Sequence, residues 1–87
     1  MTKTEIIDKV NAFLVDEYEK EPDLLKPTAR IREDLDLNSL DYMDLIVTTN
    51  RTFGLRLVPA QLNMVVTLED LYDFIERELN NKSAKEA

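Results

Sequence analysis

The chain has 87 residues, 44% of them hydrophobic, and its 18 acidic and 11 basic side chains give a net charge of -7. This length allows one domain with one small core, and the absence of Cys and His excludes a Ser-His-Asp triad, a thiol nucleophile and a His- or Cys-ligated zinc site. The negative charge argues against nucleic acid as a partner, and the single glycine excludes the Gly-rich loops that bind nucleotide phosphates.

A first helix is predicted near the start of the chain. Apolar residues recur at three- and four-residue steps between Ile6 and Tyr18, which predicts a helix with one buried face. Thr2 and Glu5 stand before this pattern in capping-box spacing, so we expect the helix to begin between them.

The pattern breaks over residues 19–37, where Pro22 and Pro27 forbid a continuous helix. A loop of this length is uncommon in a compact domain, so we expect it to contain a short helical turn or to have a function of its own. Scattered apolar residues are expected to anchor it to the core: Leu24, Leu25, Ile31, Leu35 and Leu37.

A second helical pattern runs to Phe53 and is followed by Gly54, the usual residue for a left-handed helix cap. We expect this helix to begin near Ser39 and its first apolar residue, Leu40, to anchor it to the core. The apolar residues that indicate this helix are Leu40, Met43 and Val47 on one stripe, with Ile46 and Phe53 beside it. Met43 is expected on the exposed edge beside Ser39.

Two further helices are predicted after this point. Pro59 is expected to be the first residue of a brief helical segment over residues 60–65. Thr67 is expected to cap the last helix, with Asp70 three residues further on. The buried stripe of that helix is predicted to be Leu68, Leu71, Phe74, Ile75 and Leu79.

These elements predict an all-α protein, a small four-helix bundle of three main helices and one short helix, with a long loop after the first helix. We expect residues 1–80 to form the domain and residues 81–87 to be a flexible C-terminal tail. No stretch approaches the roughly 20 apolar residues of a membrane span, and the N-terminal sequence does not resemble a signal peptide. We therefore expect a cytoplasmic monomer.

Ser39 is the residue around which chemistry is expected. In one interpretation Asn38 or Ser39 is simply the helix cap, whose side-chain oxygen accepts a backbone N–H. In the other, Ser39 carries an esterified phosphate, which the positive end of the helix dipole favours. Five acids between residues 33 and 44, with no base among them, oppose a phosphate there: Glu33, Asp34, Asp36, Asp41 and Asp44.

This segment resembles the acyl carrier proteins, whose hallmark is Asp-Ser-Leu at the start of the second helix of a four-helix bundle. The corresponding residues here are Asn38-Ser39-Leu40, and the resemblance extends over most of the chain, through residues 37–45, 53–59 and 67–75. It implies the four-helix bundle of acyl-carrier type and a carrier that catalyses nothing itself, with no catalytic residues and no metal site.

The resemblance further implies that a phosphopantetheinyl transferase attaches 4'-phosphopantetheine to Ser39, between Asn38 and Leu40, and that acyl groups are carried as thioesters on this arm. It implies that acyl-loading, acyl-transfer or synthase enzymes with basic docking surfaces contact Asp41, Met43 and Asp44. Family members hold the acyl chain between the second and third helices. The candidate walls are Ile46, Val47, Leu62, Val65 and Leu71, and ordinary core is the favoured alternative for most of them.

The chain departs from the family pattern at two places. Asn38 replaces the usual Asp before the serine, which removes a charge that could help the transferase. The end of the second helix, residues 48–52, has no acid where fatty-acid carriers are usually acidic, which indicates a specialised carrier of a secondary pathway. Two alternatives remain: an aminoacyl or peptidyl carrier, which the acidity and the lack of glycines argue against, and a carrier-like adaptor that never receives the arm.

Overall fold

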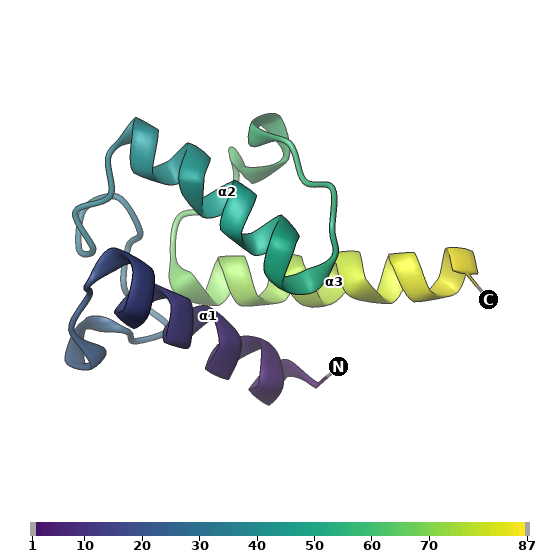
Figure 1. The fold of residues 1–87 in the computed structure, drawn as a ribbon, viewed down its shortest axis with the longest axis horizontal. Helices are drawn as coiled ribbons and strands as arrows, with labels where there is room; N and C mark the ends of the chain where they lie inside the picture. Colours follow the sequence, from purple (N-terminus) through teal and green to yellow (C-terminus); the bar gives the residue numbers. More distant parts are fainter. Residues whose placement is uncertain (1, 87) are drawn as a thin grey trace.

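The structure, a computed structural model, describes residues 2–86, with side chains up to residue 81. Figure 1 shows an all-helical arrangement in which α1 and α2 lie on different sides of α3, and α1 contacts both other helices. In the described part of the chain, the contact between Arg30 and Thr67 is an isolated bridge and does not belong to a strand. The predicted all-α class is confirmed. The elements in chain order are α1 (Lys3–Tyr18), η1 (Pro22–Leu24), α2 (Ser39–Phe53), η2 (Pro59–Leu62) and α3 (Leu68–Glu86), where η marks a 3₁₀-helix.

The start of α1 is the predicted capping box. The Thr2 side chain accepts a hydrogen bond from the Glu5 backbone N–H at 3.2 Å, and the Glu5 carboxylate accepts one from the Thr2 backbone N–H. Each side chain thus satisfies a backbone donor that the first turn of a helix leaves without an intrahelical acceptor. The buried face predicted for this helix is confirmed by Ile6, Val10 and Leu14, all fully buried.

The segment between α1 and α2 contains the expected helical turn, η1, and is held against the start of α3. The Ile31 backbone N–H donates to the Val66 carbonyl at 2.9 Å, and the Leu68 N–H donates to the Ala29 carbonyl at 3.0 Å. Ile31, Leu35 and Leu37 are buried and Leu25 is partly buried, as predicted. The prediction is wrong for Leu24, which lies in η1 with 44% of its surface exposed.

The prediction that Leu40 anchors α2 to the core is wrong, whereas Met43 is exposed as expected. Leu40, Met43 and Val47 are 81%, 51% and 60% exposed, so the predicted stripe faces solvent and Leu40 does not anchor the helix. Both sides of this helix carry apolar residues, and periodicity alone therefore does not decide which side is buried. The buried residues are Tyr42, Leu45, Ile46, Thr48, Thr49 and Phe53.

The end of α2 is fixed by Gly54 and Asn50. Gly54 has φ 66°, a left-handed conformation that costs glycine little, and its backbone N–H donates to the Asn50 carbonyl. The Asn50 side-chain amide then pairs with Leu57, donating to its carbonyl at 3.0 Å and accepting from its N–H at 2.8 Å. Asn50 thereby satisfies both polar groups of a residue in the segment that leads to η2.

The remaining elements follow the prediction with different bounds. The short helix begins at Pro59, as expected, but η2 is a single 3₁₀ turn that ends at Leu62 rather than near residue 65. The backbone of α3 continues to Glu86. The division into a domain of residues 1–80 and a flexible tail of 81–87 stays a prediction, since residue 87 and the side chains from residue 82 onward lie outside the described structure. Among the described helices, none is both long and apolar enough to cross a membrane.

The hydrogen bonds of the Asp70 carboxylate predict that the stability of the fold depends on pH in the acidic range. Its carboxylate accepts hydrogen bonds from the backbone N–H groups of Thr67 and Val66, at 3.1 and 3.2 Å, and the Thr67 hydroxyl accepts the Asp70 N–H, which confirms Thr67 as a cap. The two backbone donors hold the pKa of Asp70 below its usual value. A depressed pKa stabilises the folded state above the unfolded-state pKa of about 3.9, and this stabilisation is lost as the pH falls through the folded-state pKa.

Asp70→Asn is therefore expected to be less stable than the wild type at pH 7, with a difference that shrinks as the pH falls below about 4. Urea unfolding at a series of pH values measures this difference. Asp8→Asn is the matched control, because Asp8 is exposed on α1 and the structure shows no hydrogen bond for its carboxylate. A difference between Asp70→Asn and wild type that stays constant down to pH 2 would contradict the assignment.

Candidate functional site

Ser39 is the first residue of α2, and the structure decides which neighbouring residue caps this helix. The Asn38 side chain accepts a hydrogen bond from the Asp41 backbone N–H at 2.9 Å, and the Asp41 carboxylate accepts one from the Asn38 N–H at 3.2 Å. Asn38 is therefore the cap. The Ser39 side chain is exposed, and the structure shows no hydrogen bond for its hydroxyl. The fold leaves this hydroxyl available for chemistry.

The position also suits a phosphate ester. Ser39 and Leu40 lie in the first turn of α2, where backbone N–H groups have no intrahelical acceptor. Together with the helix dipole, such groups stabilise an anion by about 0.3 to 1 kcal/mol. The exposed hydroxyl, the adjacent donors and the open surface therefore fit a phosphopantetheine arm attached at Ser39.

Two of the five acids predicted to oppose a phosphate are compensated by Arg30. The Arg30 guanidinium forms ion pairs with Glu33 and with Asp34, the second at 3.3 Å. The Arg30 backbone N–H also donates to the Asp34 carboxylate at 2.8 Å. This backbone hydrogen bond and the guanidinium hold the pKa of Asp34 below its usual value. The negative charges of Glu33 and Asp34 are thus partly compensated by Arg30.

Asp44, one of the predicted partner contacts, is tied to α1. The Tyr18 hydroxyl donates to the Asp44 carboxylate at 2.9 Å and lies 3.3 Å from the Thr48 hydroxyl. Burial, together with the charge of Asp44, raises the pKa of Tyr18 to about 12, so this hydroxyl remains a donor at neutral pH. Asp44 therefore lies on the exposed surface of α2, and its carboxylate is hydrogen-bonded to Tyr18 of α1.

The other predicted partner contacts differ in accessibility. Met43 is half exposed, on the same side of α2 as the exposed Leu40 and Val47. Asp41 is only partly exposed and uses a carboxylate oxygen in the capping box. The accessible surface next to Ser39 is consequently more apolar than the sequence predicts. No group of three or more carboxylates suited to a metal ion occurs among the residues that the structure describes.

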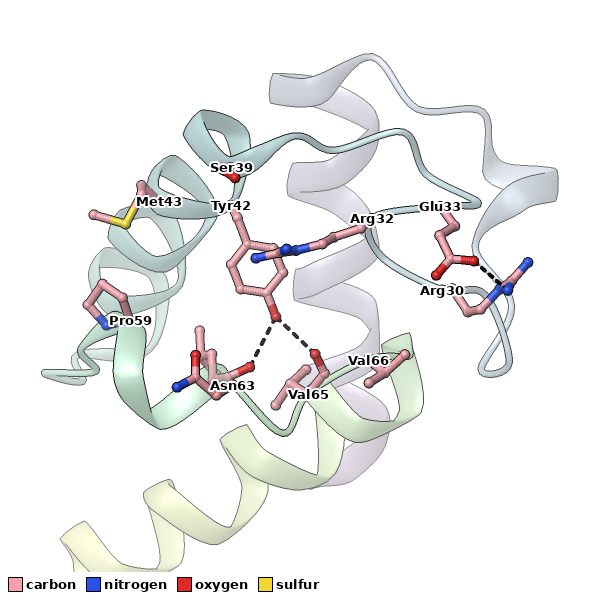
Figure 2. A pocket seen from close by; sticks show the side chains of 11 residues that line it. Arg30, Arg32, Glu33, Ser39, Tyr42, Met43, Pro59, Asn63, Val65 and Val66 are labelled. Atoms are coloured by element: carbon pink, nitrogen blue, oxygen red, sulfur yellow. Dashed lines mark hydrogen bonds and ion pairs between the residues drawn. The ribbon is translucent and has the colours of Figure 1, made fainter.

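A groove of about 520 Å³ is lined by Ser39 together with residues of α2, η2, the loop before α3 and the segment of residues 30–33. Figure 2 shows Tyr42 inside it, with its hydroxyl directed toward the loop before α3. That hydroxyl donates to the carbonyls of Val65 and Leu62 at 3.1 and 3.4 Å, and the Arg32 guanidinium lies over the Tyr42 ring at 5.1 Å from its centroid. The groove is lined by Arg30, Arg32, Glu33, Ser39, Tyr42, Met43, Pro59, Leu62, Asn63, Val65 and Val66.

The five predicted acyl-pocket residues fall into three groups. Leu62 and Val65 line the groove. Ile46 and Leu71 are buried in the hydrophobic core and do not line the groove. Val47 lies on the exposed face of α2 and belongs neither to the groove nor to the core. Tyr42 and Arg32, which no sequence motif indicates, line this groove together with Ser39 and residues of the loop before α3.

Comparisons with known proteins match most of the chain to one family. Residues 8–75 match the family model described as a phosphopantetheine attachment site. The chain is 34% identical to the acyl carrier protein of Thermosynechococcus vestitus over 84 residues, which cover 97% of this chain and 99% of that protein. It is 30% identical to the acyl carrier protein of Petrotoga mobilis, covering 92% and 94% of the two chains, and 29% identical to acyl carrier protein 2 of Ralstonia nicotianae, covering 87% and 94%.

Proposed function

The chain belongs to the acyl carrier protein family, and on this premise we propose that Ser39 is the residue to which its 4'-phosphopantetheine arm is attached. Members of this family are carriers and not enzymes. When attached, the arm supplies a terminal thiol on which acyl groups are carried as thioesters. The observation that supports Ser39 is its exposed hydroxyl at the first position of α2, which the helix does not use because Asn38 is the cap.

The protein's own residues would present the arm and restrain its base. The capping box of Asn38 and Asp41 fixes the first turn of α2 and hence the position of the Ser39 hydroxyl. The groove beside Ser39 provides apolar walls from Leu62 and Val65. We propose these two residues, rather than the exposed Val47, as walls that an acyl chain or the arm itself contacts.

The surface of α2 suggests which enzymes the carrier serves. We propose that a phosphopantetheinyl transferase and acyl-loading or acyl-transfer enzymes approach the exposed face that contains Met43 and Asp44. At the far end of α2, Arg51 forms an ion pair with Glu17 of α1 at 2.9 Å, so Glu17 neutralises the positive charge of Arg51. Basic residues on the docking surfaces of these enzymes would meet the exposed Asp44, and the absence of acids at residues 48–52 favours partners of a specialised acyl-transfer pathway. We propose that the carrier itself is cytoplasmic.

The proposal is tested by the intact mass of the purified protein before and after incubation with coenzyme A, Mg²⁺ and a broad-specificity phosphopantetheinyl transferase. The expected result is a gain of one phosphopantetheine per chain. A mass that stays unchanged with several transferases would contradict the proposal and favour an unmodified adaptor that uses α2 only to bind partners.

A further inference from the structure

Arg32 occupies an unusual position among the charged residues near Ser39. Its guanidinium lies over the Tyr42 ring, and both residues line the same groove as Ser39. Figure 2 shows the Arg32 side chain lying across the Tyr42 ring, with Ser39 near the point where the Tyr42 side chain leaves α2. Arg30, the other cation of the groove, is engaged by Glu33 and Asp34. The structure shows no carboxylate partner for Arg32 among the residues it describes.

We propose that the Arg32 guanidinium binds the phosphodiester of the arm on Ser39 and thereby directs the base of the arm into the groove along Tyr42. This inference rests on the proposed attachment at Ser39. Arg32 acts in it as a positioning residue for the arm, and the groove, rather than open solvent, receives the first part of the pantetheine chain.

The ester bond to Ser39 keeps the phosphodiester close to Arg32 at all times, whereas free anions must diffuse to it. A phosphate esterified to Ser39 stays within a few ångströms of the serine oxygen, so its effective concentration at a neighbouring side chain is high, on the order of millimolar or more. A guanidinium also presents several N–H donors in a planar fork that matches two phosphate oxygens, which gives a stronger hydrogen-bonded pair than a lysine could form.

Tyr42 lowers the cost of forming this contact. Its hydroxyl is held by the carbonyls of Leu62 and Val65, so the ring is fixed in the groove. The guanidinium that stacks on a fixed ring is already restricted, and less side-chain entropy is lost when it binds an anion. Tyr42 also follows Ser39 by three residues in α2, a spacing that puts both on one face of the helix.

The other charged residues near Ser39 are already engaged, so Arg32 is the cation that can bind the phosphodiester. Glu33 also lines the groove, but it forms an ion pair with Arg30. The Asp41 carboxylate, one helical turn from Asn38, accepts the Asn38 N–H. A phosphodiester added here would otherwise face several carboxylates, and Arg32 supplies the compensating charge that the fold has not already used.

The test uses the modified protein, with complete attachment verified by intact mass. The ³¹P resonance of the phosphodiester is recorded at constant pH over a series of NaCl concentrations for the wild type, Arg32→Gln, Arg32→Lys and Arg56→Gln. Arg56 is the matched control, because it is an exposed arginine for which the structure shows no ion pair, and it does not line the groove. The Arg32 side-chain Nε–H signal is followed in ¹H–¹⁵N spectra of the unmodified and modified wild type.

At low salt we expect the ³¹P resonance of Arg32→Gln to be shifted from that of the wild type, with Arg32→Lys between them and Arg56→Gln at the wild-type position. The difference should decrease with added NaCl, since the screening length falls from about 10 Å at 0.1 M to about 3 Å at 1 M. The Arg32 Nε–H signal should shift on modification.

Identical ³¹P resonances in the wild type and Arg32→Gln at every salt concentration would overturn the inference while leaving attachment at Ser39 intact. A shift in Arg56→Gln as large as in Arg32→Gln would assign the effect to net charge and would also overturn it. Failure of the wild type to gain the arm would overturn the proposed function, and this inference with it. Circular dichroism verifies that each exposed-arginine variant is folded before the spectra are compared.

Discussion

Ser39→Ala is expected to abolish the mass gain on incubation with coenzyme A and a transferase, and to change the free energy of unfolding by less than about 0.5 kcal/mol. The first effect follows because the hydroxyl is the proposed attachment atom. The second follows because this side chain is exposed and makes no hydrogen bond in the structure. Intact mass and urea unfolding measure the two effects independently.

Asn38→Ala is the matched variant, because it changes the residue next to Ser39. It should lower the stability of the protein and leave attachment of the arm intact. Loss of the cap that Asn38 provides for the Asp41 N–H is expected to lower the free energy of unfolding by about 0.5 to 2 kcal/mol. The arm should still be attached, since Ser39 is retained. Asn38→Asp should keep both the cap and the arm, because Asp caps helices about as well as Asn.

Either of two results would contradict this assignment. A Ser39→Ala protein that is strongly destabilised would mean that the serine is structural. A Ser39→Ala protein that still gains one phosphopantetheine would place the arm on another hydroxyl, and the family's attachment residue would not correspond to Ser39 in this chain.

Helix starts were predictable from the sequence because their determinants are local. A capping residue and its partner are three positions apart, so the pairs Thr2–Glu5 and Thr67–Asp70 can be recognised in the sequence, and the structure contains both. The choice between Asn38 and Ser39 as the cap of α2 could not be made in this way. Both residue types are favoured caps, and only the hydrogen bond from the Asp41 N–H identifies Asn38.

The buried face of α2 was not predictable from the sequence, for a physical reason. Leu40, Met43 and Val47 form as regular a stripe as the residues that are buried, and a helix with apolar residues on both sides is oriented by its neighbours. Tyr42 and Thr48 decide the orientation through contacts with residues at least 20 positions away in the sequence. Such contacts leave no periodic signal.

The candidate site shows the same division between local and distant determinants. Ser39 was recognised because the residues that carry the family pattern are its immediate neighbours. Arg32 was not recognised, because within residues 19–37 it is one charge of a long loop. Only the fold places its guanidinium over the Tyr42 ring and in the groove that Ser39 also lines.

The largest expected loss of stability at this site is that of Tyr42→Ala, which should lower the free energy of unfolding by about 3 to 5 kcal/mol, the range for truncating a buried aromatic residue. The Tyr42 ring is buried between α2 and the loop before α3, under the Arg32 guanidinium. Removing it would leave a cavity where the fold joins these elements, which a domain of this size tolerates poorly.

Tyr42→Phe separates the ring from its hydroxyl. The ring and its contact with Arg32 remain, but the Val65 carbonyl loses its hydrogen bond, whereas the Leu62 carbonyl still accepts the Val65 N–H. One buried acceptor left without a partner costs about 1 to 3 kcal/mol. Amide hydrogen exchange should therefore accelerate over residues 62–66, and Tyr18→Phe, whose hydroxyl bonds the exposed Asp44, should not accelerate it. A Tyr42→Phe protein with wild-type stability and exchange would mean that the hydroxyl does not hold this wall of the groove.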